Sequence, residues 1–381
     1  MRCEGMPLIY FDNAATSRIK PEPVYAALNY YLREIGTSPG RGSYKLSVQA
    51  SRMLYQSRKT VADFFGIPDS SCVYFSKSST ESINLFFNGL LSEGDHVIIS
   101  CYEHNAVLRP IHSLSENSGV TYSVLTDDDL YSQDLSKLEK YISPHTKVVA
   151  LTLASNLTGQ LVYRREIGEF FKNKGISVFV DASQGGGKHL INMSKDSVDY
   201  LAFTSHKDLL GVPGSGGLCC LAELKIPPLI QGGTGLFGDL YMNPEVYPEA
   251  YEAGTLNMPA IWSLKAGIDY VQENEEKINS KEKQLTELLV EGLKSLPNTI
   301  VYNADKPRVP TICFNVRGKK SNEVVHILDQ NDICVRGGIH CTILAHKTLG
   351  TVQTGTIRAS LNYNNTSEEI EKFITCINEI R

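Results

Sequence analysis

Short apolar runs that alternate with segments of helical spacing constrain the fold of this chain more than any other feature. The runs have the length and composition of strands and lie at residues 72–75, 95–100, 147–153, 176–180 and 198–203. The segments between them carry apolar residues three and four positions apart, as one face of a helix does. Strands that alternate with helices predict an α/β domain, in which helices cover both faces of a mostly parallel sheet.

Polar residues follow each of these runs. They are Ser79 and Thr80, then His104, Asn156, Asp181 with Gln184, and Thr204 with His206 and Lys207. In α/β sheets of this kind, ligands bind beyond the carboxyl ends of the strands. The strands that precede Asp181 and Lys207 are separated by enough chain for a crossover, so their ends could open on one crevice.

Two of these positions have an ordinary structural explanation beside a functional one. The hydroxyls at 78–80 precede a helical segment and could cradle a phosphate on free backbone N–H groups. Ser and Thr are, however, also the usual caps of any helix. His104 could stack on a flat heteroaromatic ring or carry a proton, and a structural histidine is about equally compatible with the sequence.

Asp181 and Lys207 indicate one cofactor more specifically. A carboxylate at the end of a buried strand is costly unless it faces a cation, and a protonated pyridine nitrogen would be one. A lysine amine can form an imine with an aldehyde if its pKa is lowered, although a single lysine is more often a solvated residue. A phosphate cradle, a ring stacker, an amide for a phenolic oxygen, a carboxylate and a lysine together fit pyridoxal phosphate.

Composition excludes several other classes of protein. The chain has 381 residues, a net charge of −5 and no basic stretch, so nucleic acid is not an expected partner. No apolar run approaches the ~20 residues of a membrane helix. Because the N-terminus lacks the apolar region of a signal peptide, we expect a cytoplasmic protein. Nine cysteines without a CxxC pair argue against a disulfide framework and against a metal site.

The length of the chain suggests one large domain and one smaller domain. We place the large, cofactor-binding domain at residues 20–255. Residues 1–19 and 256–381 would form a smaller α+β domain, and a helix at 262–296 with a long charged face would link the two.

A set of motifs extends nearly from end to end of the chain. They are YFDNAAT at 10–16, SSTESINL at 78–85, EHNAVL at 103–108, DASQ at 181–184, TSHK at 204–207, EAGTLN at 252–257, RGGIHC at 336–341 and GTIRASLNYNNTSEEI at 355–370. With these motifs the chain resembles the class V aminotransferase family of fold-type I pyridoxal-phosphate enzymes. Within that family it most closely resembles the cysteine desulfurases and selenocysteine lyases.

The resemblance implies a role for each cofactor residue. Lys207 would form the imine with the cofactor, Asp181 would pair with the pyridine nitrogen, and His104 would stack on the ring. The phenolic oxygen would be approached by Gln184 and Asn156, and the phosphate would be held by Ser79, Thr80, Thr204 and His206. Thr255 would reach the phosphate from the second subunit of a homodimer, since cofactor sites of this family lie at the subunit interface.

The resemblance also implies substrate-binding residues. Arg358 would pair bidentately with the substrate carboxylate, a task suited to a guanidinium group, and Arg336 and Asn13 would also serve the substrate. The substrate would be L-cysteine or a related amino acid.

Cys341 decides which reaction the resemblance implies. In the desulfurases, a cysteine thiolate takes the sulfur of L-cysteine as a persulfide and leaves L-alanine, and Cys341 stands where that cysteine stands in the Suf-type branch. Arg336 and His340 precede it, and a nearby arginine or histidinium lowers the pKa of a thiol. The sequence thus predicts a cysteine desulfurase that passes sulfur to an acceptor protein.

Two other readings remain open at this point. A selenocysteine lyase, an aminotransferase or a C–S lyase would use the same cofactor without a persulfide and would not require Cys341. A non-catalytic scaffold is disfavoured because Lys207 and Asp181 are both present.

Overall fold

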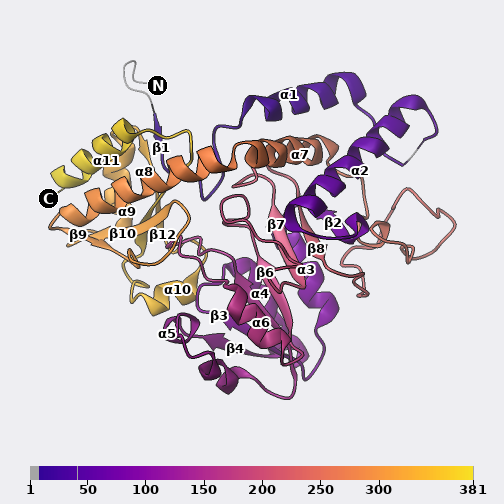
Figure 1. Ribbon diagram of the computed structural model, residues 1–381, viewed down its shortest axis with the longest axis horizontal. Helices are drawn as coiled ribbons and strands as arrows, with labels where there is room; N and C mark the ends of the chain where they lie inside the picture. The colour runs from indigo at the N-terminus through magenta and orange to yellow at the C-terminus, as the bar shows by residue number, and fades with distance from the viewer. Residues whose placement is uncertain (1–7, 41, 381) are drawn as a thin grey trace. The chain divides into compact units, whose positions relative to one another are not determined.

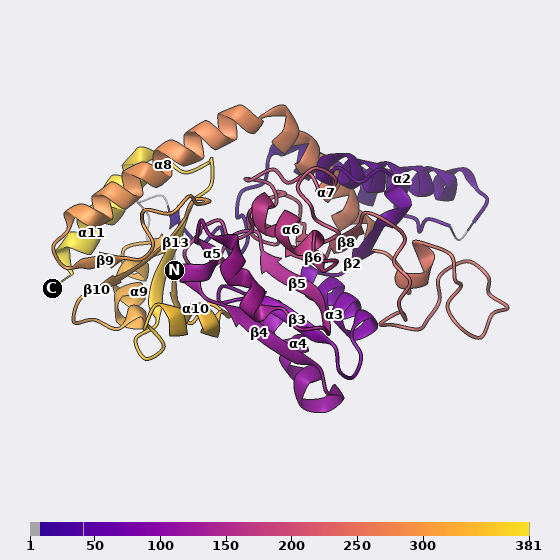
Figure 2. The same cartoon turned by 60° about the horizontal axis from the view of Figure 1, so that its bottom comes forward.

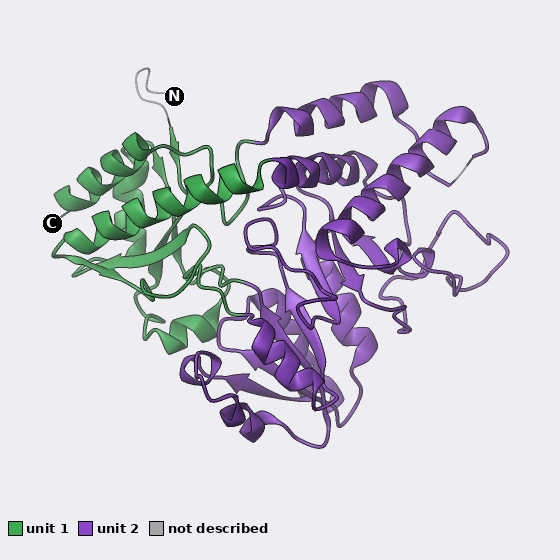
Figure 3. Ribbon diagram, in the orientation of Figure 1, with its two compact units in different colours: residues 1–19, 154–162, 274–381 green, residues 20–153, 163–273 purple. Residues whose placement is uncertain are grey.

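A computed structural model describes residues 8–40 and 42–380, so Cys3 lies outside the described residues (Figure 1). The chain forms two compact units (Figure 3). The large unit comprises residues 20–153 and 163–273, and the small unit comprises residues 1–19, 154–162 and 274–381.

The large unit is built on one sheet, which has seven strands in the described part of the chain. Their order is β2 (Val73–Ser76), β8 (Gly216–Cys220), β7 (Tyr200–Thr204), β6 (Ser177–Asp181), β5 (Thr146–Thr152), β3 (His96–Ser100) and β4 (Thr121–Leu125). β8 is antiparallel to both of its neighbours, whereas β7, β6, β5, β3 and β4 are mutually parallel. The prediction of an α/β fold with a largely parallel sheet is confirmed (Figure 2).

Helices accompany this sheet as the alternating pattern predicts. They are α1 (Glu22–Tyr30), α2 (Lys45–Phe65), α3 (Ser79–Leu90), α4 (Asn105–Ser118), the one-turn α5 (Asp127–Leu130), α6 (Arg165–Lys172) and α7 (Met258–Glu273). Apolar side chains join helix and sheet, as where the ring of Phe86 on α3 stacks on Phe179 of β6 with centroids 4.7 Å apart. Both side chains are fully buried, so α3 is fixed on the sheet by the hydrophobic effect.

The small unit contains a four-stranded antiparallel sheet in the order β12 (Arg336–Gly338), β13 (Thr356–Ser360), β10 (Thr311–Val316) and β9 (Thr299–Val301). A second, parallel pair joins β1 (Ile9–Tyr10) to β11 (Ile333–Cys334). Its helices are α8 (Glu275–Ser295), α9 (Ser321–Asp329), α10 (Ile343–Thr348) and α11 (Ser367–Glu379). Phe373 of α11 meets Phe11 and Phe314 edge to face in its core.

The segment expected as one helix at 262–296 is two helices. α7 ends at Glu273 and α8 begins at Glu275, because Asn274 has φ −120° and ψ 16°, outside the helical region. α7 packs against α1 and α2, which places residues 256–273 with the large unit rather than the small one.

Residues 154–162 group with the small unit instead of the large one. Val309 donates its N–H to the carbonyl of Gly159 at 2.9 Å, and Leu161 donates to Pro307 at 2.8 Å. Gly159 has φ +75°, and a Cβ there would lie 2.2 Å from the carbonyl oxygen of Thr311, so the close approach to β10 requires glycine. None of the described helices is both long enough and apolar enough to span a membrane.

Candidate functional site

The predicted cofactor residues of the large unit gather at one edge of its sheet. Asp181 and Thr204 are the last residues of the adjacent parallel strands β6 and β7, and the carboxyl ends of parallel strands share an edge. His206 and Lys207 follow directly after β7. His104 stands at the start of α4, four residues beyond the end of β3 at Ser100.

The Asp181 carboxylate is buried and held in one orientation. Its Oδ1 atom accepts hydrogen bonds from the backbone N–H of Ser183 at 3.0 Å and from the Ser183 hydroxyl. Gln184, also buried, has a side-chain oxygen with no hydrogen-bond partner among the described residues. A buried amide that lacks a partner is costly, and a bound ligand would satisfy it.

His104 has a defined ring orientation. Its Nδ1 atom accepts a hydrogen bond from the backbone N–H of Ala106 at 3.0 Å and so caps α4. Because Nδ1 accepts, the neutral ring carries its proton on Nε2. His104 therefore has a structural task as the cap of α4. Its ring is half-buried and is held in place by this hydrogen bond.

The three hydroxyl-bearing residues at 78–80 occupy different positions at the start of α3. Ser78 is the cap of α3, with its hydroxyl accepting from the N–H of Glu81 at 3.3 Å. Ser79 and Thr80 occupy the first turn, where backbone N–H groups are not used by the helix. Gly216 lets β8 approach this turn, since a Cβ there would lie 2.8 Å from the Ser79 nitrogen.

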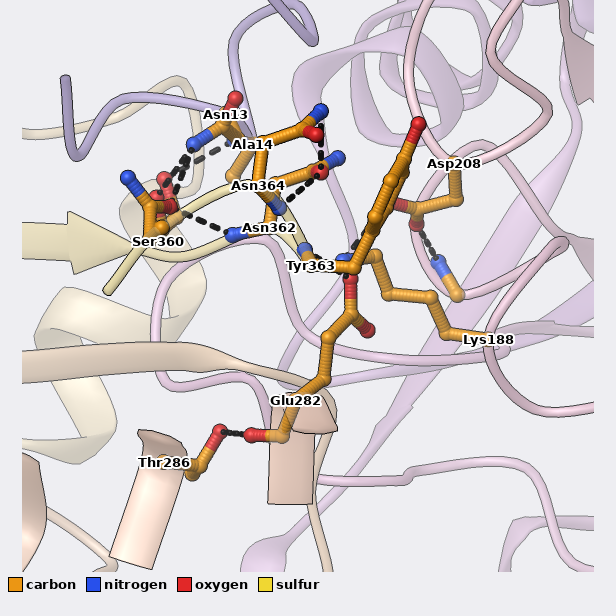
Figure 4. Close-up of polar contacts among 12 residues, drawn as sticks. Asn13, Ala14, Lys188, Asp208, Glu282, Thr286, Ser360, Asn362, Tyr363 and Asn364 are labelled. Carbon is orange, nitrogen blue, oxygen red and sulfur yellow. Dashed lines mark hydrogen bonds and ion pairs between the residues drawn. The ribbon is translucent and has the colours of Figure 1, made fainter. Parts of the chain in front are cut away.

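Two buried lysines that sequence reasoning did not single out lie beside residues that follow β7. Lys20 is buried and donates from Nζ to the carbonyl of His206 at 2.9 Å, and burial lowers its pKa to about 8. Lys188 places its Nζ atom 3.7 Å from Oδ1 of Asp208 (Figure 4). Burial and the charges of Lys207 and Lys20 lower the pKa of His206 to about 4, so its ring is neutral at pH 7. The charges of Lys20 and Lys207 beside His206 suit an anionic ligand.

Glu103 is a second residue that sequence reasoning missed, although it directly precedes His104. Its carboxylate is fully buried and accepts from the Ser100 hydroxyl at 2.5 Å and from the Thr152 N–H at 2.8 Å. It therefore ties the end of β3 to the end of β5. Burial, together with the charge of Asp181, raises the pKa of Glu103 to about 8.

In the small unit, Arg358 is the centre of a buried polar network. It lies on β13, directly opposite Arg336 on β12 and Cys313 on β10, and its side chain is 1% exposed. Its guanidinium donates to the carboxylate of Asp12 at 2.6 Å and to the backbone carbonyl of Asn156 at 2.9 Å. Its Nε atom has no hydrogen-bond partner in the described part of the chain, which leaves a donor for a ligand.

Asn13 contributes to structure within the same unit. Its amide donates to the carbonyl of Ser360 at 3.1 Å and to that of Tyr10 at 3.2 Å, and Ser360 in turn accepts from the N–H of Ala14 (Figure 4). These bonds join the segment after β1 to the end of β13. The assignment of Asn13 to the substrate stays a prediction.

Asn156 joins the arginine network to the turn that carries Cys341. Its side-chain amide donates to the backbone carbonyl of His340 at 2.8 Å, while its own carbonyl accepts from Arg358. Its side-chain oxygen is buried without a partner among the residues described. Cys341 follows His340 and is exposed, unlike the other described cysteines, which are buried or partly buried.

The structure alters one detail of the predicted activation of Cys341. His340 is buried, and its ring donates to the backbone carbonyl of Arg336 at 3.2 Å. Burial and the charges of Arg358 and Arg336 lower the pKa of His340 to about 3. A histidinium is therefore not available beside Cys341 at pH 7, and Arg336 remains as the predicted cationic neighbour.

Comparison with known proteins shows the family of this chain. A family model described as Aminotransferase class-V matches residues 9–373. The chain belongs to the aminotransferase class-V family. Among curated relatives in this family, a probable cysteine desulfurase from Pyrococcus abyssi (strain GE5 / Orsay) is 35% identical, covering 98% of this chain and 94% of its own. A probable cysteine desulfurase from Methanothermobacter thermautotrophicus is 33% identical with the same coverage of both chains.

Solved structures of class-V relatives share the fold. The apo structure of a cysteine desulfurase from Thermococcus onnurineus NA1 has a TM-score of 0.88 and 35% identity, and it covers 98% of this chain and 94% of that one. The cysteine desulfurase CsdA of Escherichia coli, in an S-sulfonic acid form, has a TM-score of 0.85 and 25% identity over 97% and 94% of the two chains.

Proposed function

We propose that this class-V protein is a pyridoxal-phosphate-dependent cysteine desulfurase, which converts L-cysteine into L-alanine and receives the sulfur on Cys341 as a persulfide. One observation carries the assignment of Cys341. Asn156 binds Arg358 with its carbonyl and the Cys341 turn with its amide, so an exposed thiol and a buried guanidinium belong to one network. A desulfurase needs this combination, because it must bind an amino-acid carboxylate and attack the sulfur of the same molecule.

The groups of the large unit fit the cofactor. Asp181 would hold the pyridine nitrogen, Gln184 would donate a hydrogen bond from its side-chain NH₂ group to the phenolic oxygen, and His104 would cover the ring. When bound, pyridoxal phosphate supplies an electron sink for the amino acid's α-carbon. Lys207 would hold the aldehyde carbon, and its Nζ atom would carry a proton to and from the substrate's α-carbon.

The phosphate would lie at the first turn of α3. Ser79 and Thr80 offer hydroxyls and unused backbone N–H groups there, and Thr204 and His206 would add to them. Lys20 increases the positive potential beside His206. Thr255 is exposed in the described subunit, and we propose that it completes the phosphate site of a second copy in a homodimer.

The sulfur-transfer step balances without an external oxidant. The Cys341 thiolate attacks the sulfur of the substrate, an S–S bond forms, and the C–S bond breaks. The electron pair of the broken C–S bond stays on the substrate's β-carbon. This carbon takes a proton and becomes the methyl group of alanine. The outer sulfur of the persulfide then passes to a thiol, on an acceptor protein or a small reductant. We propose that this occurs in the cytoplasm and requires no metal.

Replacement of Cys341 tests the proposal. We expect Cys341→Ser to abolish alanine formation from L-cysteine in the presence of a thiol reductant, while the absorbance of the bound cofactor stays unchanged. Cys376→Ser is the matched control, because that cysteine lies on α11, away from the Cys341 turn in sequence and partly buried. Full activity in Cys341→Ser would instead favour a lyase or aminotransferase reaction that needs no persulfide.

A further inference from the structure

The turn that presents Cys341 has an unusual backbone. His340 has φ +53° and Cys341 has φ +58°, so two consecutive residues other than glycine lie in the left-handed region. Side chains with a Cβ rarely adopt this conformation, and such residues persist only where the surroundings hold them. The contacts of His340 should therefore show what holds the turn.

Hydrogen bonds to its backbone hold part of the turn. The carbonyl of His340 accepts from Asn156 at 2.8 Å, and the N–H of Thr342 donates to the carbonyl of Ile339 at 3.1 Å. The His340 ring donates from Nε2 to Arg336, but its Nδ1 atom has no hydrogen-bond partner within the described residues. One hydrogen bond leaves the plane of a ring free to rotate about it, so a second contact must fix the ring.

The second contact is His346, which sequence reasoning did not single out. Its ring lies parallel to the His340 ring, with an interplanar angle of 6° and centroids 6.0 Å apart, as in an offset stack. His346 is fully buried on α10, and its Nδ1 atom is 2.8 Å from the Thr351 hydroxyl. The N–H of Thr351 also donates to the backbone carbonyl of His346 at 2.9 Å, so Thr351 is held close to His346 and its hydroxyl anchors the ring at Nδ1.

We propose that His346 is a positioning residue for the Cys341 thiol: its ring, anchored by Thr351, supports the ring of His340 and so maintains the left-handed turn. Without this support the turn relaxes toward an ordinary backbone conformation, and the thiol leaves its place. The catalytic consequence rests on the proposed function, whereas the effect on the thiol's position does not.

Three variants distinguish the effect of the stacked ring from the effect of filling space in the core. His346→Phe keeps an aromatic ring against His340 and loses the bond to Thr351. His346→Leu fills most of the volume and loses the stack, and Thr351→Val removes the anchoring hydroxyl with little change in shape. Unfolding temperature and cofactor absorbance are measured for each, so that loss of folded protein is not read as loss of activity.

The first readout is steady-state alanine formation by the cofactor-loaded enzyme. We expect His346→Leu to lower kcat about tenfold and to leave KM for L-cysteine unchanged. A tenfold change in rate corresponds to the free-energy cost of holding one residue in the left-handed conformation. His346→Phe should stay within about threefold of the parent, and Thr351→Val should lie between the two. A purely structural role would lower the unfolding temperature of all three and leave kcat per folded molecule unchanged, which would overturn the proposal.

The second readout does not depend on desulfurase activity. Iodoacetamide alkylates Cys341, and peptide mass spectrometry gives its rate relative to partly buried Cys334 as an internal reference. We expect the Cys341 rate to change by about threefold or more in His346→Leu and to stay near the parent value in His346→Phe. Equal rates in the parent and His346→Leu would refute the positioning role even if the proposed reaction is correct. Loss of the proposed function alone would leave this readout intact.

Discussion

Glu103 makes the stability of the large unit dependent on pH, and Glu103→Gln tests this. In the folded protein the carboxyl group keeps its proton up to a pKa of about 8, whereas its usual pKa is 4.5. The folded state therefore binds more protons than the unfolded state between these values. It follows that the contribution of Glu103 to stability decreases as pH rises from about 4.5 to about 8.

The structure sets an upper limit on the size of the effect. One pH unit between the two pKa values corresponds to about 1.4 kcal/mol, so at pH 7.5 the contribution reaches at most about 4 kcal/mol. Glutamine does not titrate, yet its side-chain oxygen can still accept from the Ser100 hydroxyl and the Thr152 N–H. Glu103→Gln should therefore gain stability relative to the parent as pH rises, by about 1 to 4 kcal/mol between pH 4.5 and pH 7.5.

Urea unfolding followed by circular dichroism at several pH values measures this difference. Glu116→Gln is the matched control, because Glu116 lies on α4, the helix that follows Glu103 in the chain, and is exposed. The control should follow the parent at every pH. A constant difference between Glu103→Gln and the parent across this range would show that Glu103 ionises normally, and the reasoning would be wrong.

Two further predictions concern ion pairs made by a buried arginine, one in each unit. Arg58 and Glu252 form a bidentate pair with N–O distances of 2.7 and 2.8 Å and side chains 7% and 5% exposed. Arg58→Ala leaves the Glu252 carboxylate unpaired and should cost about 3 to 5 kcal/mol in urea unfolding, and a cost below about 1 kcal/mol would contradict this. Asp12→Asn removes the charge that orients Arg358 and should raise KM for L-cysteine about tenfold with little change in kcat; an equal fall in kcat would place Asp12 in the chemical step instead.

Local sequence patterns were enough to predict the fold and the ends of the central strands. Asp181 and Thr204 are the last residues of β6 and β7, as the apolar runs before them indicate. Periodicity did not reveal the break at Asn274, because the apolar spacing continues across it while one residue leaves the helical region.

The missing site residues depend on contacts between distant parts of the chain. Asp12 and Arg358 are 346 residues apart, and Lys20 and His206 are 186 residues apart. No spacing rule joins such pairs, since only the folded backbone brings them together. His346 lies only five residues from Cys341, yet a histidine on a short helix gives no sign in sequence that its ring stacks on another.

A single turnover most directly tests the central claim that Cys341 receives the sulfur. The cofactor-loaded protein is mixed with L-cysteine in the absence of reductant, alkylated, digested and analysed by peptide mass spectrometry. The account predicts one added sulfur atom on the peptide that contains Cys341, in an amount equal to the alanine released. Alanine released with no added sulfur on that peptide, or with the sulfur on another cysteine, would contradict it.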